Sequence, residues 1–213
     1  MTAPNTVPPN PPAIGQPCPA CGQPVESRLV CLACGALLAL NPTSPGGLDF
    51  FGWFGLPPAM ALDTALLSDR WRRLGFRLHP DLHRGDSALG PALALRLSSA
   101  VNAAYKMLLD PAARGAYLLA ELSRRAGFTP DPKALPEGFL RDMFNLQEQL
   151  EESGPAEQQH TRGGLNRQLQ ALRTERDRLL TEALETALPE APALTRIQQL
   201  LNQEKYLVKL SAE

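Results

Sequence analysis

Four cysteines, all between residues 18 and 34, constrain this chain more than any other feature of its sequence. They form two matching pairs, Cys18-Pro-Ala-Cys21 and Cys31-Leu-Ala-Cys34, and a glycine follows each pair. Two residues between the thiolates let both sulfurs face one ion, and the glycine tolerates the turn that follows. Because the segment is short and has few large apolar residues, it cannot fold without a metal or a cross-link.

The two pairs predict a structural Zn²⁺ site, since four soft ligands in a tetrahedral array suit zinc, with iron as the second candidate. Four cysteines leave no coordination position open, which argues against a catalytic zinc. A thiol–disulfide redox role is the competing interpretation. It usually needs a C-x-x-C pair at a helix N-terminus in a βαβ context, which the sequence lacks.

The overall charge excludes several classes of partner. Lys and Arg (21) and Asp and Glu (22) cancel to a net charge of -1, so no global field attracts nucleic acid or an anionic membrane. No apolar run reaches about 18 residues, so we expect no transmembrane helix. The first 17 residues lack both a basic and an apolar signal region, and we therefore expect a cytoplasmic protein.

From Leu48 onward the apolar residues follow helical spacing, which predicts an all-α fold. The only β structure we expect is a small hairpin among the cysteines. Proline-rich and glycine-rich stretches divide the helical part into two groups, and the second contains three helices that should pack as an antiparallel bundle. The expected organisation is a disordered tail, a tetracysteine zinc ribbon, a linker and two helical domains, at residues 1–17, 18–40, 41–48, 49–125 and 126–213.

The first helical domain contains two helices joined by a polar loop. Asp63 can cap a helix that starts at Thr64 and carries one apolar stripe. Arginines flank this stripe, and the helix ends at His79-Pro80-Asp81 because a proline disfavours helical backbone in the residue before it. Pro91 opens the second helix. The stripe residues of the first helix and its arginines are Leu67, Trp71, Leu74, Leu78, Arg70, Arg72, Arg73 and Arg77.

Two antiparallel helices around a His-Pro-Asp loop, the first rich in arginine, resemble a J-domain. In that family the loop and the basic helix face bind a DnaK-type chaperone and stimulate its ATPase. By position, the resemblance implies chaperone contacts at His79, Pro80, Asp81, Arg72, Arg73 and Arg77. The arginines taken alone would fit an ordinary helical hairpin with a solvated face. Leu82 and Phe76 depart from the family pattern, which commonly has lysine and a polar residue there.

Further motifs resemble the HscB family, the J-type co-chaperones of iron–sulfur cluster biogenesis. They are Asp49-Phe50-Phe51-x-x-Phe54-Gly55, Arg114-x-x-Tyr117-Leu118 and Phe139-Leu140-x-x-Met143, within a resemblance that covers residues 49–210. The family implies an L-shaped molecule in which a J-domain precedes a three-helix bundle that binds the scaffold protein IscU. Some relatives carry a similar tetracysteine segment.

The bundle carries a candidate client surface. On the helix from 137 to 152, Leu140 and Phe144 lie about a third of a turn from the expected core stripe and continue toward acidic residues. On the last helix, Ile197, Leu201 and Val208 define the expected core side. The resemblance implies scaffold contacts at Leu140, Phe144, Glu148, Glu152 and Tyr206, with Arg141 and Asn145 departing from the pattern. The alternative is that the bundle core is simply wide.

These observations predict a co-chaperone for a DnaK/HscA-type ATPase and an IscU-like scaffold, with no enzymatic chemistry of its own. A generalist J-domain protein is the first alternative, although generalists usually bind clients through other domains. A nucleic-acid-binding zinc ribbon is the second, yet only Arg28 adds positive charge between Cys18 and Gly35. With three histidines and no cysteine or serine beside a positioned base, an enzyme is least expected.

Overall fold

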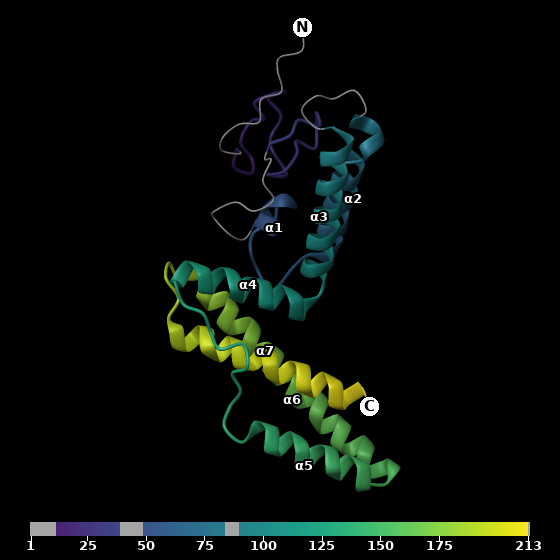
Figure 1. Cartoon of the computed structure of the whole chain (residues 1–213), viewed down its shortest axis with the longest axis vertical. Helices are drawn as coiled ribbons and strands as arrows, with labels where there is room; N and C mark the ends of the chain where they lie inside the picture. The colour runs from purple at the N-terminus through teal and green to yellow at the C-terminus, as the bar shows by residue number, and fades with distance from the viewer. Residues whose placement is uncertain (1–11, 39–48, 84–89, 213) are drawn as a thin grey trace. The chain divides into compact units, whose positions relative to one another are not determined.

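The computed structural model describes residues 12–38, 49–83 and 90–212, which form an all-helical fold (Figure 1). The expected all-α class is confirmed. In the cysteine segment, β structure amounts to two isolated bridges, Pro17–Pro24 and Val30–Leu37. Most of the expected disordered tail and the whole 41–48 linker lie outside the described residues. No helix in the described part of the chain is long and apolar enough to cross a bilayer.

The chain divides into two compact units, Met1–Arg114 and Gly115–Glu213. The division falls inside helix α4 (Pro111–Ala126), whereas the sequence analysis placed the domain boundary after residue 125. Asp110 starts α4, because its carboxylate accepts hydrogen bonds from the backbone N–H groups of Ala112 and Ala113, each at 2.8 Å. Helix α4 is therefore shared between the units.

The first unit contains the cysteine segment and the helical hairpin. Its helices before α4 are α1 (Asp49–Trp53), α2 (Thr64–Arg77), the 3₁₀ turn η1 (Pro80–His83) and α3 (Pro91–Leu109). The expected helix starts are confirmed. The Asp63 carboxylate accepts from the N–H groups of Ala65 and Leu66, both at 2.9 Å, and Pro91 occupies the first turn of α3.

Facing apolar stripes hold α2 and α3 together. The fully buried members are Leu67, Leu74, Leu78, Ala94, Leu97, Val101, Ala104 and Leu108. Trp71 is only partly buried, but its ring stacks on Tyr105 at a centroid distance of 4.5 Å, and its Nε1–H donates to Asn102 Oδ1 at 2.7 Å. This packing fixes the direction of α2, and therefore the place where its polar C-terminal turn emerges.

The second unit contains the three expected bundle helices, α5 (Phe139–Glu152), α6 (Pro155–Glu185) and α7 (Ala191–Ala212). Leucines dominate their shared core, joined by Phe139 and Met143 of α5. One expected core residue is wrong: Val208 is 40% exposed, and the buried stripe of α7 passes through Leu207 instead. Neighbouring residues on a helix point about 100° apart, and here Leu207 faces the core while Val208 points toward solvent.

A charged cluster lies inside this unit. The buried Glu204 carboxylate on α7 accepts from Arg173 Nε at 2.7 Å and from Arg176 Nη1, both on α6. Arg176 is fully buried and also contacts Asp177 at 2.8 Å. Because buried charges are tolerated only when paired and hydrogen-bonded, these four side chains act as one polar unit within the bundle.

Candidate functional site

The two cysteine pairs fold as near copies of each other. In the first, the Gly22 N–H donates to the Cys18 carbonyl at 2.8 Å, and in the second the Gly35 N–H donates to the Cys31 carbonyl at 2.8 Å. Both glycines adopt positive φ, 73° and 81°, as the turn after each pair requires. We call these two loops the first and second knuckle, at residues 18–22 and 31–35.

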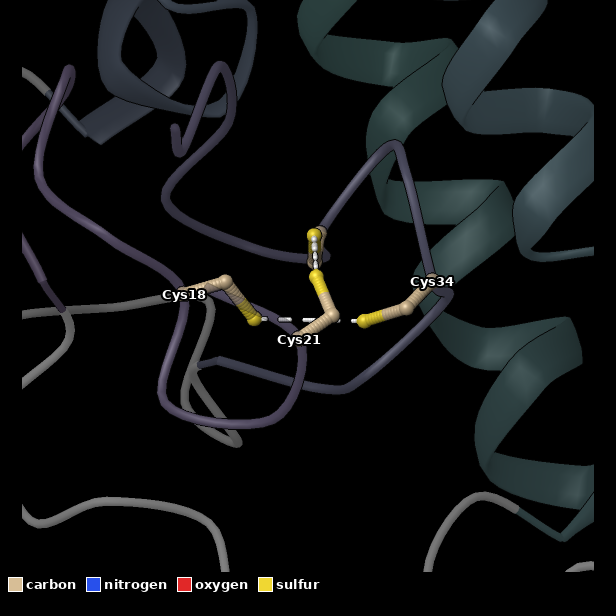
Figure 2. A group of neighbouring side chains, drawn as sticks. Cys18, Cys21 and Cys34 are labelled. Atoms are coloured by element: carbon tan, nitrogen blue, oxygen red, sulfur yellow. Dashed lines mark hydrogen bonds between the residues drawn. The ribbon is translucent and has the colours of Figure 1, made fainter. Parts of the chain in front are cut away.

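The four sulfurs converge on one point. Cys18 and Cys34 Sγ are 3.9 Å apart, Cys21 and Cys31 Sγ are 3.8 Å apart, and all four lie within 4.8 Å of one another. Figure 2 shows the labelled side chains turned toward a common centre. Four sulfurs about 2.3 Å from a tetrahedral Zn²⁺ would stand about 3.8 Å apart, whereas a disulfide needs about 2.05 Å. The cluster therefore fits a tetrahedral metal ion.

The surroundings of Cys18, Cys31 and Cys34 affect how readily their thiols ionise. Burial raises the pKa of Cys18 and raises that of Cys34 to about 12, so neither thiol ionises readily by itself. Burial acts in the same direction on Cys31, but N–H groups of Cys34 and Ala33 hydrogen-bond its sulfur, and the net effect lowers its pKa. A bound divalent cation favours the thiolates directly.

The segment between the knuckles packs against the basic face of α2. The Glu26 carboxylate accepts from Arg70 and, through both oxygens, from Arg73 at 3.0 and 3.1 Å. The hydrogen bond from Arg73, opposed by partial burial and aided by the charge of Arg70, holds the pKa of Glu26 below its ordinary value. We call these three residues the Glu26 clamp.

The second knuckle itself contacts α2 through Arg77. Arg77 Nε donates to the Leu32 carbonyl at 3.0 Å, and its Nη2 donates to the Ala33 carbonyl at 2.6 Å. Both acceptors belong to the main chain between Cys31 and Cys34. The guanidinium therefore binds the closed loop of the knuckle rather than a particular side chain.

Helix α1 provides a third contact. The Arg28 N–H donates to the Gly52 carbonyl at 3.0 Å. Gly55 has a φ of +64°, and a Cβ placed there would lie 2.1 Å from the Glu26 carbonyl oxygen. The cysteine segment is therefore docked on the helices of its unit, although the sequence suggested that a linker keeps it apart.

The His-Pro-Asp turn is exposed and ordered. The side chains of His79 and Asp81 are both mostly in solvent, with His79 Nδ1 3.8 Å from Asp81 Oδ2. His79 Nδ1 accepts from the Asp81 N–H at 3.3 Å. Behind the turn, the buried His83 donates its Nε2–H to the Arg77 carbonyl at 2.7 Å, which ties η1 to the end of α2.

The structure separates the arginines expected to bind a chaperone. Arg72 is exposed and forms a long ion pair with Asp69, at 3.9 Å, whereas Arg73 and Arg77 contact the cysteine segment. Two residues of this site, Glu26 and His83, were not predicted from the sequence. The signal for Glu26 was charge complementarity, since it is the one acidic residue between the knuckles and faces an arginine stripe.

Three of the expected scaffold residues are large apolar or aromatic side chains that are exposed on α5 and α7. Leu140 and Phe144 are more than half exposed, with Phe144 at 66%, and the acidic Glu148 and Glu152 are also exposed. Tyr206 is partly exposed, and its ring packs edge-on against Phe139 at a centroid distance of 5.8 Å. That contact places Tyr206 on the side of α7 that faces α5. We call Leu140, Phe144 and Tyr206 the α5 patch.

Comparison with known proteins identifies the family. No protein-family model matches the chain. A Bordetella pertussis protein, "Co-chaperone protein HscB homolog", is 30% identical over 169 residues, which cover 77% of this chain and 95% of the relative. The chain belongs to the HscB family. The human "Iron-sulfur cluster co-chaperone protein HscB" is 33% identical over 144 residues, covering 64% of this chain and 57% of the human protein.

Solved HscB structures share the fold. The crystal structure of the human co-chaperone HscB superposes with a TM-score of 0.65 at 23% identity, over 92% of this chain and 95% of that one. The expected resemblance to HscB is therefore confirmed, and the four-cysteine cluster is consistent with the expected tetracysteine segment.

Proposed function

We propose that this HscB-family chain stimulates the ATPase of a DnaK/HscA-type chaperone and delivers an IscU-like iron–sulfur scaffold to it. The exposed His79-Pro80-Asp81 turn at the end of an arginine-rich helix carries the proposal. Its relatives are named co-chaperones, and the human one is named for iron–sulfur clusters. The chain supplies binding surfaces, and the partner supplies the reaction.

The turn is built to present two polar side chains. The bond from His83 to the Arg77 carbonyl anchors η1, and the Asp81 N–H fixes the His79 ring. A partner therefore meets His79 and Asp81 in a set geometry, which lowers the entropy lost on binding. Arg72 adds an exposed positive charge on α2, the helix that precedes the turn.

The test is His79→Gln, measured as stimulation of a purified DnaK-type ATPase. The side chain is exposed, so the substitution removes no core contact and the helical signal should stay unchanged. We expect stimulation to fall to the basal rate. His160→Gln, at an exposed position of α6, is the matched control. Stimulation by the His79 variant at the wild-type level would contradict the proposal.

The α5 patch is the proposed scaffold site. Large apolar side chains are tolerated singly in water, but clustered ones usually mark an interface. Glu148 and Glu152 form an acidic rim on the same helix. A client-specific patch supports the iron–sulfur scaffold over the generalist alternative.

Phe144→Ala tests the patch. A central aromatic anchor commonly contributes about 2 kcal/mol or more to binding, so affinity for an IscU-like scaffold should fall roughly 30-fold or more. Stability should change little, because Phe144 is exposed. Titration calorimetry and a melting curve measure both effects, with the exposed Leu188→Ala as control. A large drop in melting temperature with unchanged binding would place the scaffold site elsewhere.

The cysteine cluster is proposed to hold one structural Zn²⁺ on Cys18, Cys21, Cys31 and Cys34. Bound there, zinc would keep four thiolates together and close both knuckles. The residues that contact α2, Glu26 and the main chain at 32 and 33, lie between or within these knuckles. The proposed role of the metal is therefore to keep the docked segment in shape.

A further inference from the structure

A pocket of about 310 Å³ lies where the second knuckle meets α2. Leu32 lines it from the knuckle, and four residues line it from α2: Arg72, Arg73, Phe76 and Arg77. The pocket therefore exists only because the cysteine segment is docked on this helix.

Phe76 is the unusual member of this surface. It is 65% exposed, although it is large, apolar and surrounded by arginines. An exposed aromatic beside a pocket is a common anchor for a partner, since burying it on binding contributes more than most contacts do. Its position is also informative, because the His79 N–H donates to the Phe76 carbonyl at 3.3 Å. Phe76 therefore lies within one helical turn of His79 along the chain.

The pocket is also positively charged. Arg77 donates to two carbonyls, which carry no formal charge, so its own charge is not neutralised there. Glu26 offsets one of the two positive charges of Arg70 and Arg73. Within the described residues, Arg72 pairs with Asp69 at 3.9 Å, and both of these side chains are exposed. An acidic partner complements this surface, and arginine and aromatic side chains are the types enriched at interface cores.

We propose that the second knuckle and α2 form one docking surface for an acidic, apolar segment of the DnaK-type chaperone, with Phe76 as its anchor. This inference rests on the proposed co-chaperone function and adds the zinc segment to the chaperone contact. The first knuckle has the same fold but lines no part of this pocket. The two knuckles therefore have different roles, and the second is part of the interface.

The anchor is tested by Phe76→Ser in the full-length, zinc-loaded protein, with affinity for a purified DnaK-type chaperone measured by titration. Affinity should fall at least tenfold. Leu95→Ser, at a similarly exposed apolar position on α3 outside the pocket, should bind as the wild type does. Zinc content and helical signal verify that both variants fold.

The knuckle is tested by an added charge. Ala33→Glu places a carboxylate on the second knuckle, and Ala20→Glu does the same at the matching position of the first. Both alanines are exposed, and the Arg77 contact uses only the main chain at position 33. If the chaperone segment is acidic and lies on the second knuckle, Ala33→Glu should weaken binding about tenfold and Ala20→Glu should not. Higher salt should narrow the difference.

Each outcome decides between the ideas. If Phe76→Ser and Ala33→Glu both bind the chaperone normally while His79→Gln abolishes stimulation, the proposed docking surface is wrong and the proposed function stands. If His79→Gln also has no effect, both fail. If Phe76→Ser instead abolishes self-association seen by analytical ultracentrifugation and leaves chaperone affinity unchanged, a second copy occupies the surface and the proposal is overturned.

Discussion

Each unit of the molecule contains one glutamate held by two arginines, and the two clusters differ in burial. In the Glu26 clamp the glutamate side chain is 38% exposed, and it joins the cysteine segment to α2. In the bundle, the Glu204 side chain is 4% exposed and joins α7 to α6. The same type of cluster, a glutamate with two arginines, therefore connects two elements at the surface in one unit and inside the core in the other.

Burial decides what such a cluster contributes. A half-exposed ion pair gains little, because water and salt compete for both charges. In a buried pair the attraction is stronger, but it only offsets a large desolvation cost. The intact pair therefore adds little net stability, whereas removing one partner is strongly destabilising. The Glu26 clamp thus orients a segment that other forces hold together, whereas Glu204 is required by the charges around it.

Metal removal should have the largest effect on the structure. It should disrupt the Glu26 clamp and leave the Glu204 cluster of the bundle intact. Structural zinc contributes on the order of 10–16 kcal/mol in zinc-finger peptides, so chelation should unfold residues 18–35 and free Glu26. The bundle core contains no residue of this segment, so most of the helical signal should remain. Metal analysis, circular dichroism and hydrogen exchange measure the three effects. Collapse of the whole helical signal would contradict this independence.

Glu204→Gln should cost the bundle about 3–5 kcal/mol, because it leaves the buried Arg176 without its main partner. Urea unfolding measures the loss. Replacing both residues by apolar ones, Arg176→Met with Glu204→Leu, should recover much of it. A single-variant loss below about 1 kcal/mol would mean that the cluster is more hydrated than its burial indicates.

Glu26→Gln should cost about 1 kcal/mol or less, while increasing protease access to the cysteine segment. Its pH dependence has a defined sign. Arg73 lowers the folded pKa of Glu26 below its ordinary 4.5, so the clamp is stabilising above that value and is lost as pH falls through the lower folded pKa. Glu175→Gln, in an exposed pair with Arg178, is the control. If the protease cleaved the cysteine segment equally fast in both variants, the Glu26 clamp would have no role in holding that segment on α2.

The local features of the fold were predictable from sequence. The cap at Asp63, the start at Pro91, the helix end before Pro80 and the two knuckles all follow from residues a few positions apart. The exposed side chains of the α5 patch also follow from helical phase.

The contacts that join distant segments were not predictable in the same way. Glu26 and Arg73 are 47 positions apart, and no periodicity connects them. Arg176 and Glu204 have the residue types of a solvated face, yet they are buried because their partners come from the neighbouring helix. The prediction for Val208 was wrong for a related reason, since the packing of α7 buries Leu207 and leaves Val208 exposed. Pairing between elements depends on three-dimensional packing, which a one-dimensional pattern does not contain.

The contact between Arg77 and the second knuckle has a consequence for how this chain can be altered. The Arg77 guanidinium donates to two main-chain carbonyls. This contact therefore does not constrain the side chains at positions 32 and 33, and requires only that their loop is closed. Another residue at the exposed position 33 would therefore leave the contact with Arg77 in place. Protein engineers could use the second knuckle to display new side chains beside the His-Pro-Asp turn.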